Sequence, residues 1–239
     1  MGNRNILSIG NTKTAKGESK GYMTGILHLA PGALSGVQVC PMASEGCLAA
    51  CLNTAGRGRF DKIQQARINK TRWLFDDRRG FMRALVWSIK ATMRKAAREG
   101  MTPVFRLNGT SDLPWEKFKC EVDGVEYRNV MEAFPHVQFY DYTKIPARAL
   151  KWARGDMPGN YHVTFSASES NDEAVRMVAM AGGNVAVVFD SLPSHYHGRK
   201  VINGDETDLR FLDADGVIVG LKAKGDAKKD TSGFVKKVA

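Results

Sequence analysis

Six short apolar segments, separated by helical patterns, constrain the fold of this chain more than any other feature. Each segment is partly β-branched or aromatic and is flanked by Gly, Pro, Asn or Asp, as buried strands usually are. The expected strands are Thr24–Leu29, Val104–Leu107, Val137–Tyr140, His162–Phe165, Val185–Phe189 and Gly216–Leu221. The expected helices are Phe60–Phe75, Phe81–Arg98, Tyr127–Phe134, Pro146–Arg154 and Asp172–Ala181. Strands that alternate with helices predict a parallel sheet with right-handed crossovers, either a doubly wound sheet or an incomplete barrel.

We expect the incomplete barrel, as a single α/β domain over residues 1–239 with mostly parallel strands in a partial (β/α)6 TIM-like arrangement. Three segments stand apart within it: a Cys-rich loop at 36–59, a small hairpin at 119–127 that turns at Asp123-Gly124, and a Lys-rich tail at 222–239. No stretch approaches the roughly eighteen apolar residues of a membrane span. The first residues lead into no apolar signal region, so we expect a cytoplasmic protein.

Three of the four cysteines, Cys40, Cys47 and Cys51, lie close together in a C-x6-C-x3-C spacing after the first expected strand. Cys47 and Cys51 are four residues apart, so one helical turn would place both sulfur atoms on the same face. Pro41 and Gly46 favour a bent connection that brings Cys40 back to them. In a reducing compartment such cysteines are more often ligands than disulfide partners. The triplet therefore predicts a shared metal centre.

Three explanations of the triplet remain open. Small buried cysteines can pack as hydrophobes in a core. Structural zinc needs four ligands, and the fourth would be His28 or Cys120, neither of which has zinc-finger spacing. A cubane iron–sulfur cluster tolerates three protein ligands and leaves one iron open for a small molecule. Three cysteines without an obvious fourth favour a [4Fe–4S] cluster, and we expect Cys120 to be structural.

Polar and charged side chains follow the carboxyl ends of the expected strands, where ligands bind in both candidate folds. The residues expected to line a cavity or to bind an anion are Arg57, Arg59, Arg106, Asn108, Ser111, Asp112, Asp141, Tyr142, Ser166, Ser168, Glu169, Lys222 and Lys224. The formal net charge of +10 suits a small anionic ligand or nucleic acid as partner. The basic stretch Arg78–Arg98 is expected to form a solvated helix face. His195 and His197 are expected to be surface residues.

The Cys triplet after the first strand of a six-strand barrel resembles the radical S-adenosylmethionine enzymes. That resemblance implies a [4Fe–4S] cluster whose open iron binds the amino and carboxylate groups of S-adenosylmethionine. The usual spacing in those enzymes is C-x3-C-x2-C, which differs from the spacing here. Their glycine-rich motif after the second strand has no clear counterpart, because Asn108-Gly-Thr-Ser-Asp112 occupies that place.

Separate blocks of sequence resemble the tailed-phage family called gene product 88. The blocks are Cys40 through Cys51, Gly56-Arg-Gly-Arg-Phe60, Gln65-Ala66, Asn69, Arg106-Leu-Asn-Gly-Thr-Ser-Asp112 and Phe139-Tyr-Asp-Tyr-Thr143, within residues 22–190. The stretches Asp208–Asp213 and Gly220–Gly225 are similar to phage-encoded members. The resemblance implies a phage protein of the host cytoplasm with a cysteine-bound centre, but it supplies no reaction.

Two functions follow as hypotheses. The first is an iron–sulfur protein with a cluster at the mouth of a radical-S-adenosylmethionine-like partial barrel, whose reaction and enzymatic character the sequence leaves open. The second is a non-catalytic, metal-stabilised protein that binds nucleic acid or regulates another process, with zinc as the alternative metal.

Overall fold

Eight strands form one open sheet in the part of the chain that the structure, a computed structural model, describes: residues 5–10, 16–54 and 56–238, without the side chains of Thr54 and Arg57. Across the sheet the strands are β1 (Tyr22–Ile26), β2 (Thr102–Arg106), β5 (Gln138–Thr143), β6 (Tyr161–Ser166), β7 (Val185–Phe189), β10 (Ile218–Lys222), β9 (Arg199–Asn203) and β8 (His195–Tyr196). All neighbours are parallel except β8 and β9. The six expected strands are confirmed, and the expected mostly parallel α/β fold with them.

From β1 to β7 the strands lie in chain order, but β8 and β9 lie beyond β10, so the chain passes over one strand position after β7 and returns to fill it with β10. A doubly wound sheet reverses direction at a switch point between its two halves, whereas the direction here reverses only among the last three strands. The sheet is not closed, because β1 and β8 lie at opposite edges. One expected boundary was wrong: β1 ends at Ile26, so His28 lies in the loop after the strand and not inside it.

The sequence did not predict the hairpin of β8 and β9. Only two residues of β9, Val201 and Ile202, are strongly apolar, and the two-residue β8 beyond it forms the edge of the sheet, where much of the surface is left to solvent. His197 and Gly198 turn the hairpin, with φ angles of 48° and 74°. His195 and His197 are exposed there, as expected.

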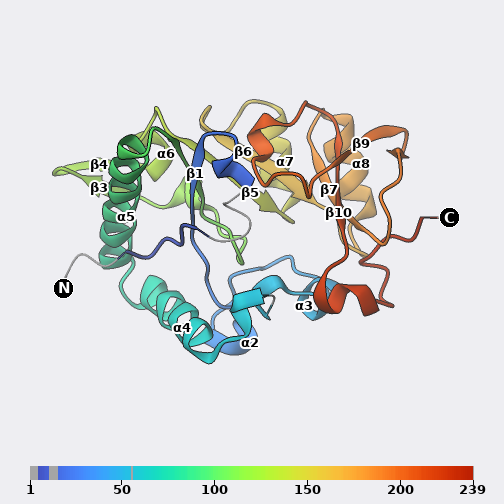
Figure 1. Cartoon of the computed structure of the whole chain (residues 1–239), viewed down its shortest axis with the longest axis horizontal. Helices are drawn as coiled ribbons and strands as arrows, with labels where there is room; N and C mark the ends of the chain where they lie inside the picture. Colours follow the sequence, from blue (N-terminus) through green and yellow to red (C-terminus); the bar gives the residue numbers. More distant parts are fainter. Residues whose placement is uncertain (1–4, 11–15, 55, 239) are drawn as a thin grey trace.

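Helices α5 (Arg78–Arg98), α7 (Pro146–Ala153) and α8 (Asp172–Met180) cover one face of the sheet. Helix α4 (Asp61–Asp76) packs on α5, and the short α6 (Val130–Ala133) packs on the hairpin at 120–127; all five lie close to the expected positions. Figure 1 shows α5 to the left of β1, with α7 and α8 farther to the right along the sheet. From α5, Leu85 and Ile89 enter a core with Phe105 and Phe139, which explains the apolar stripe of this helix. Right-handed crossovers in chain order place successive helices on the same face.

The opposite face is filled by the connection between β9 and β10, residues 207–213. Leu209 packs on Val104 and Tyr140, and the ring of Phe211 lies 5.5 Å from the ring of Tyr140. Arg210 in the same connection is completely buried. This face, which would be the inside of a barrel, is therefore packed with protein.

The expected hairpin insert is present as β3 (Cys120–Val122) and β4 (Val125–Tyr127). Asp123 and Gly124 have φ angles of 51° and 83°, as a two-residue turn of type I′ requires. Tyr127 therefore belongs to a strand, and the expected helix at Tyr127–Phe134 begins only at Val130. Cys120 is buried in the main core, in agreement with a structural role.

The Lys-rich segment at 222–239 begins inside β10 and is held against the sheet. After the short helical turn η5 (Gly225–Lys229), Lys236 pairs with β7, donating from its N–H to Val188 O at 2.8 Å. Val235 is buried. Among the described helices, none is long and apolar enough to cross a lipid bilayer.

Candidate metal centre

The chain leaves β1 and crosses the carboxyl edge of the sheet before it reaches α4. Two short helices form on the way, α2 (Gly32–Ser35) and α3 (Glu45–Ala49), and Figure 1 shows both with α4 at this edge. Val39 is buried and accepts a hydrogen bond at 2.7 Å from Asp112 N, in the loop after β2. Cys40 is the next residue, so its position is fixed by the neighbouring strand.

Helix α3 carries Cys47 and begins at Ser44, whose hydroxyl accepts a hydrogen bond from Cys47 N. Ser44 and Glu45 form a good helix start, because Ser caps the first free N–H groups and an acidic residue suits the amino end of a helix. Helix α3 ends before Cys51, but Cys51 N still donates to Leu48 O at 3.2 Å. The predicted helical turn is therefore present in shortened form.

The three thiols lie within electrostatic reach of one another. Negative charge on Cys47 or Cys51 raises the pKa of Cys40, and negative charge on Cys51 raises the pKa of Cys47. All three side chains are half-buried. Asn53 N donates to Cys51 Sγ at 3.4 Å, and Cys40 Sγ lies 3.9 Å from Thr110 O. One loop thus gathers three sulfur atoms in a single region at the sheet edge.

The surroundings make two of these thiols poor nucleophiles. Burial raises the pKa of Cys40 to about 12, and the negative charges of Asp112 and the other two cysteines add to that effect. Burial also raises the pKa of Cys47, and the positive charge of Lys144 opposes part of this rise. Reactive cysteines have lowered pKa values, so a covalent role for Cys40 or Cys47 is disfavoured. A ligand role is compatible, since a bound metal drives thiol deprotonation.

No group of three or more His, Cys, Asp or Glu side chains in the described ranges is arranged to hold one metal ion. A single zinc ion would need a tetrahedral set of ligands, with thiolates at about 2.3 Å. The loop does not show that arrangement. An iron–sulfur cluster makes a different demand, because each cysteine binds a separate iron atom. The loop therefore supplies the thiol ligands that such a cluster uses, but the described side chains are not arranged around a metal.

Glu169 ties this loop to β6. Its carboxylate accepts hydrogen bonds from Ser44 Oγ at 2.7 Å and from Gly46 N at 2.8 Å. Burial opposes ionisation of Glu169, but these hydrogen bonds outweigh it and hold its pKa below the usual value. Glu169 was expected to line a cavity; the structure instead shows it holding the helix that carries Cys47.

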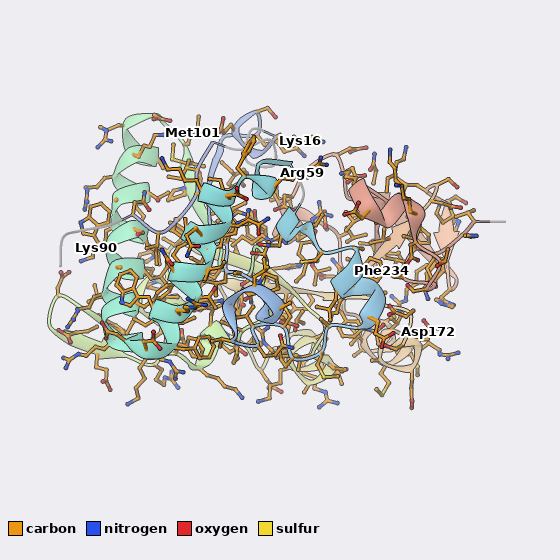
Figure 2. The ribbon with its side chains drawn as sticks, turned by 90° about the horizontal axis from the view of Figure 1, so that it is seen from below. Lys16, Arg59, Lys90, Met101, Asp172 and Phe234 are labelled. Carbon is orange, nitrogen blue, oxygen red and sulfur yellow. The ribbon has the colours of Figure 1, made fainter. Side chains whose placement is uncertain are left out.

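The C-terminal segment packs against α3 next to Glu169. Gly46 faces Ser232 and Phe234 so closely that a Cβ atom there would overlap both. Lys144 Nζ lies 5.3 Å from the centre of the Phe234 ring and donates to Ser166 Oγ at 2.8 Å. Figure 2 looks onto this edge and labels Phe234 beside α3. Between α3 and residues 226–232 remains a hollow of about 290 Å³.

Most residues expected to line a ligand cavity after β2 and β5 are engaged with one another. Asn108 Oδ1 accepts hydrogen bonds from Ser111 Oγ, Leu113 N and Trp115 Nε1 at 2.8 to 3.0 Å. Asp141 is completely buried and accepts from Asn108 N at 2.6 Å. These side chains therefore form the support of the loop and are not free to bind a ligand.

Asp112 belongs to the same buried network. Its carboxylate pairs with Arg148 at 2.8 Å and accepts from Thr143 Oγ1 at 2.8 Å. Arg148 also forms a two-pronged contact with Glu116 at 2.9 Å and donates to Tyr161 at 2.9 Å. The sequence indicated Asp112 as a ligand-binding residue. In the structure its carboxylate is instead engaged in the ion pair with Arg148, a residue of α7.

Arg106 and Tyr142 point to the face covered by residues 207–213, away from the helices. Arg106 donates from Nη1 to both carboxylate oxygens of Asp208, at 3.0 and 2.8 Å, and its guanidinium lies 4.7 Å from the Tyr142 ring. Among the described residues, most buried polar atoms without a hydrogen-bond partner lie here, on Arg106, Tyr140, Arg210 and Asp213, although Arg210 Nη1 and Asp213 Oδ2 form an ion pair at 3.2 Å. Buried atoms of this kind are normally satisfied by ordered water.

The remaining expected residues divide between the site and its surroundings. Arg59 and Lys224 line a small depression with Cys51, about 20 Å³ in volume. Lys224 also pairs with Asp205 at 2.6 Å. Ser166 contacts Lys144, as above, whereas Lys222 is exposed at the end of β10. Ser168 is buried within its own loop, where its N–H donates to Asn171. The side chain of Arg57 lies outside the described part of the chain.

Two basic residues near the thiols were not indicated by the sequence. Lys144 follows β5 and is the cation that acts on Cys40 and Cys47. Arg67, on α4, donates to Asn53 O and Oδ1 at 2.8 Å and lies within electrostatic reach of Cys51. The only sequence signal for Lys144 was its place after a strand, and Arg67 had none beyond its helix.

Comparison with protein-family models gives one finding: the model described as Gene product 88 matches residues 5–238. Neither the curated proteins nor the solved structures contain a match to the chain.

Proposed function

The chain belongs to the gene product 88 family, a phage-type family, and from that premise we propose that Cys40, Cys47 and Cys51 hold a [4Fe–4S] cluster. The observation that carries the proposal is that one loop at the carboxyl edge of a parallel sheet brings three half-buried thiols into the same region. When bound, the cluster would supply electrons and one iron open to a small molecule.

The protein contributes the placement of the ligands. Glu169 and Ser44 fix the amino end of α3, and so the place of Cys47. The N–H group of Asn53 donates to the sulfur of Cys51, and hydrogen bonds to cluster sulfur atoms are one means of setting a reduction potential. Lys144 and Arg67 offset part of the negative charge that three thiolates bring.

We also propose that the sheet acts as a partial barrel with the cluster at its mouth. Support comes from the strand order, which follows the chain from β1 to β7, and from the loop after β1, which carries the cysteines. Arg59 and Lys224 beside Cys51 suit a carboxylate or another small anion. S-adenosylmethionine is the ligand of this kind that the proposal names.

Anaerobic purification followed by iron and acid-labile sulfide analysis tests the cluster. The wild-type protein should be brown and contain about four irons per chain. Cys40→Ser, Cys47→Ser and Cys51→Ser should each lose most of the iron, whereas Cys120→Ala, the matched control in the hairpin, should retain it. A colourless wild-type protein without iron, or equal iron in all four variants, contradicts the proposal.

Addition of S-adenosylmethionine to the anaerobic protein tests the ligand separately. Coordination to the open iron should change the electron paramagnetic resonance spectrum of the reduced cluster, and Lys224→Gln should weaken that change. An unaltered spectrum would remove S-adenosylmethionine and leave the cluster assignment intact.

A second candidate is nucleic-acid binding through α5. This helix contains seven basic residues and no acidic one, and Arg83, Arg94 and Arg98 are exposed. The triple variant Arg83→Glu, Arg94→Glu and Arg98→Glu should abolish salt-sensitive binding of duplex DNA if the helix serves this role. Binding that is absent or independent of salt in the wild-type protein would reject it.

A further inference from the structure

The solvent side of α5 carries a row of basic side chains. At 3.6 residues per turn, five cations lie within roughly 100° of one another around the helix axis. We call them the basic stripe: Arg79, Arg83, Lys90, Arg94 and Arg98. None of the five is buried, and Phe81, Leu85 and Ile89 on the opposite side of the helix enter the core. The stripe is roughly 28 Å long at 1.5 Å per residue, and Figure 2 shows Lys90 at the outer edge of the molecule.

The hairpin of β3 and β4 lies against this helix. Figure 1 shows both strands beside α5 at one end of the molecule. In β3, Cys120 and Val122 are buried in the core that α5 also enters. Because side chains alternate along a strand, Glu121 between them faces outward. The turn follows at Asp123, which is also exposed. The hairpin therefore presents two carboxylates to solvent beside the helix.

These two carboxylates pair with the basic stripe. Glu121 Oε2 lies 3.1 Å from Arg79 Nη2. Both carboxylate oxygens of Asp123 accept from Lys90 Nζ, at 2.8 and 2.7 Å. Pairs between exposed side chains are weak, so a dense array of phosphates can compete with them. The hairpin thus engages two of the five cations of the stripe.

The phosphates of duplex DNA suit the basic stripe. The sequence of α5 contains no acidic residue, and Asp77 and Glu99 lie at its two caps. Along one DNA strand the phosphates follow one another at about 3.4 Å, so five cations over roughly 28 Å can each reach a different phosphate. Single strands are held by rows of aromatic side chains that stack on bases, whereas Trp87 is the only aromatic residue on this side of the helix. The geometry therefore favours a duplex.

We propose that the hairpin carboxylates limit the affinity of the basic stripe for duplex DNA. This inference rests on the second candidate function, nucleic-acid binding through α5. Glu121 and Asp123 hold two cations that would otherwise contact phosphates. Each phosphate contact contributes both to the affinity and to its dependence on salt. The hairpin therefore sets both properties of the complex.

Fluorescence anisotropy with a labelled duplex of about 16 base pairs, roughly twice the length of the stripe, tests the proposal. Glu121→Gln with Asp123→Asn should raise the affinity about tenfold at ~50 mM salt. The slope of log K against log salt should become steeper by about 1.8, because two more phosphates are contacted. Gln keeps the shape of the Glu121 side chain, and Asn-Gly is favourable in a type I′ turn, so the hairpin should keep its fold.

The charge-matched control is Glu173→Gln with Asp156→Asn. Glu173 is exposed on α8 and Asp156 is exposed after α7, so the pair removes the same two negative charges farther along the sheet. Its affinity for the duplex should stay within about twofold of the wild-type value, because exposed charges beyond a Debye length are screened. Equal affinities in the hairpin variant and in this control would overturn the proposal.

Removal of the two paired cations separates ion pairing from a general charge effect. In a protein with Arg79→Gln and Lys90→Gln, the hairpin substitutions should no longer raise the affinity, because their partners are absent. A gain of the same size in both backgrounds would contradict the proposal. Tighter binding of a single strand of the same length than of the duplex would also overturn it.

Failure of the underlying function has a different signature. If neither the wild-type protein nor the hairpin variant binds the duplex, nucleic-acid binding through α5 fails. Immobilised heparin, a sulfated polyanion, then still decides the role of the hairpin. Elution of the hairpin variant at higher salt than the charge-matched control would show that the carboxylates shield the stripe, and equal elution would reject that role.

Discussion

The carboxylate of Glu169, in the loop after β6, accepts a hydrogen bond at 2.7 Å from Ser44, the N-cap of the helix that carries Cys47. The same carboxylate accepts from Gly46 N at 2.8 Å. A single acidic side chain thus joins the fourth parallel strand in the chain to the loop after the first. The position of Cys47 therefore depends on a contact between residues that lie 125 positions apart.

Glu169→Gln should weaken this connection. The amide group of Gln offers one acceptor where the carboxylate offers two, so Ser44 and Gly46 can no longer both donate to it. We expect the free energy of unfolding to fall by roughly 1 kcal/mol, the scale of one hydrogen bond to a charged group at a half-exposed site. Urea denaturation measures this, and Glu173→Gln, on the exposed surface of α8, should change stability by less than about 0.5 kcal/mol.

The same carboxylate predicts a pH effect. Because the pKa of Glu169 is lower in the folded protein than its ordinary value, its contribution is present at neutral pH and is lost as pH falls through the folded value. The protection factors for hydrogen exchange at Gly46 and Cys47, which correct for the intrinsic pH dependence of exchange, should therefore fall in acid in the wild-type protein. Protection in Glu169→Gln should already be low at neutral pH, and identical protection profiles would contradict the assigned role.

Gly46→Ala should displace the C-terminal segment from α3. A Cβ atom at residue 46 would overlap the hydroxyl of Ser232 and would lie 2.8 Å from Cβ of Phe234. We expect limited proteolysis to cut residues 225–238 faster in the variant, because the segment can no longer pack there. Gly159→Ala is the control, since a Cβ atom there meets nothing within 4 Å. Unchanged cleavage in Gly46→Ala would show that the contact does not hold the segment.

The sequence predicted the frame of this protein well and its side-chain pairing poorly. The six core strands and the hairpin at Asp123-Gly124 depend on local patterns, apolar runs and turn residues, which a sequence displays directly. The bounds of α5 and α8 were close for the same reason. The hairpin of β8 and β9 was missed because an edge strand carries little apolar signal.

The roles of the polar residues after the strands depend on distant partners. Arg106 was indicated as an anion-binding residue, yet it pairs with Asp208, 102 residues later. Asn108 was indicated as a cavity residue, yet it organises its own loop through three hydrogen bonds. The position of a polar residue after a strand predicts that it lies at the ligand edge, but only the folded chain shows whether another side chain already occupies it.

Arg148→Met should destabilise the protein strongly. Arg148 is buried and holds both Asp112 and Glu116, so its removal leaves two carboxylates in the interior without the guanidinium, and Lys144 then acts only on Asp112. Breaking a buried ion pair on one side typically costs roughly 3–5 kcal/mol. Chemical denaturation should show a loss of that size, whereas Arg94→Met, on the exposed face of α5, should stay within about 0.5 kcal/mol. A loss below about 1 kcal/mol for Arg148→Met would mean that water reaches the carboxylates.

Asp141 should make stability fall as pH rises towards neutrality. Burial raises the pKa of this carboxyl to about 7, against the hydrogen bond from Asn108 N, which lowers it. The pKa of Asp141 in the folded protein exceeds its unfolded value of 3.8. The contribution of Asp141 to the free energy of unfolding is therefore fully present below pH 3.8 and is lost as the pH rises to about 7. Asn is neutral, and its amide can accept from Asn108 N and donate to the Tyr161 hydroxyl, which now donates to Asp141 at 2.9 Å. Asp141→Asn should therefore gain stability relative to wild type, by at most roughly 4 kcal/mol between about pH 4 and pH 8. Urea denaturation over that range measures the difference, and parallel pH profiles for the two proteins would show that Asp141 is ionised in the fold throughout.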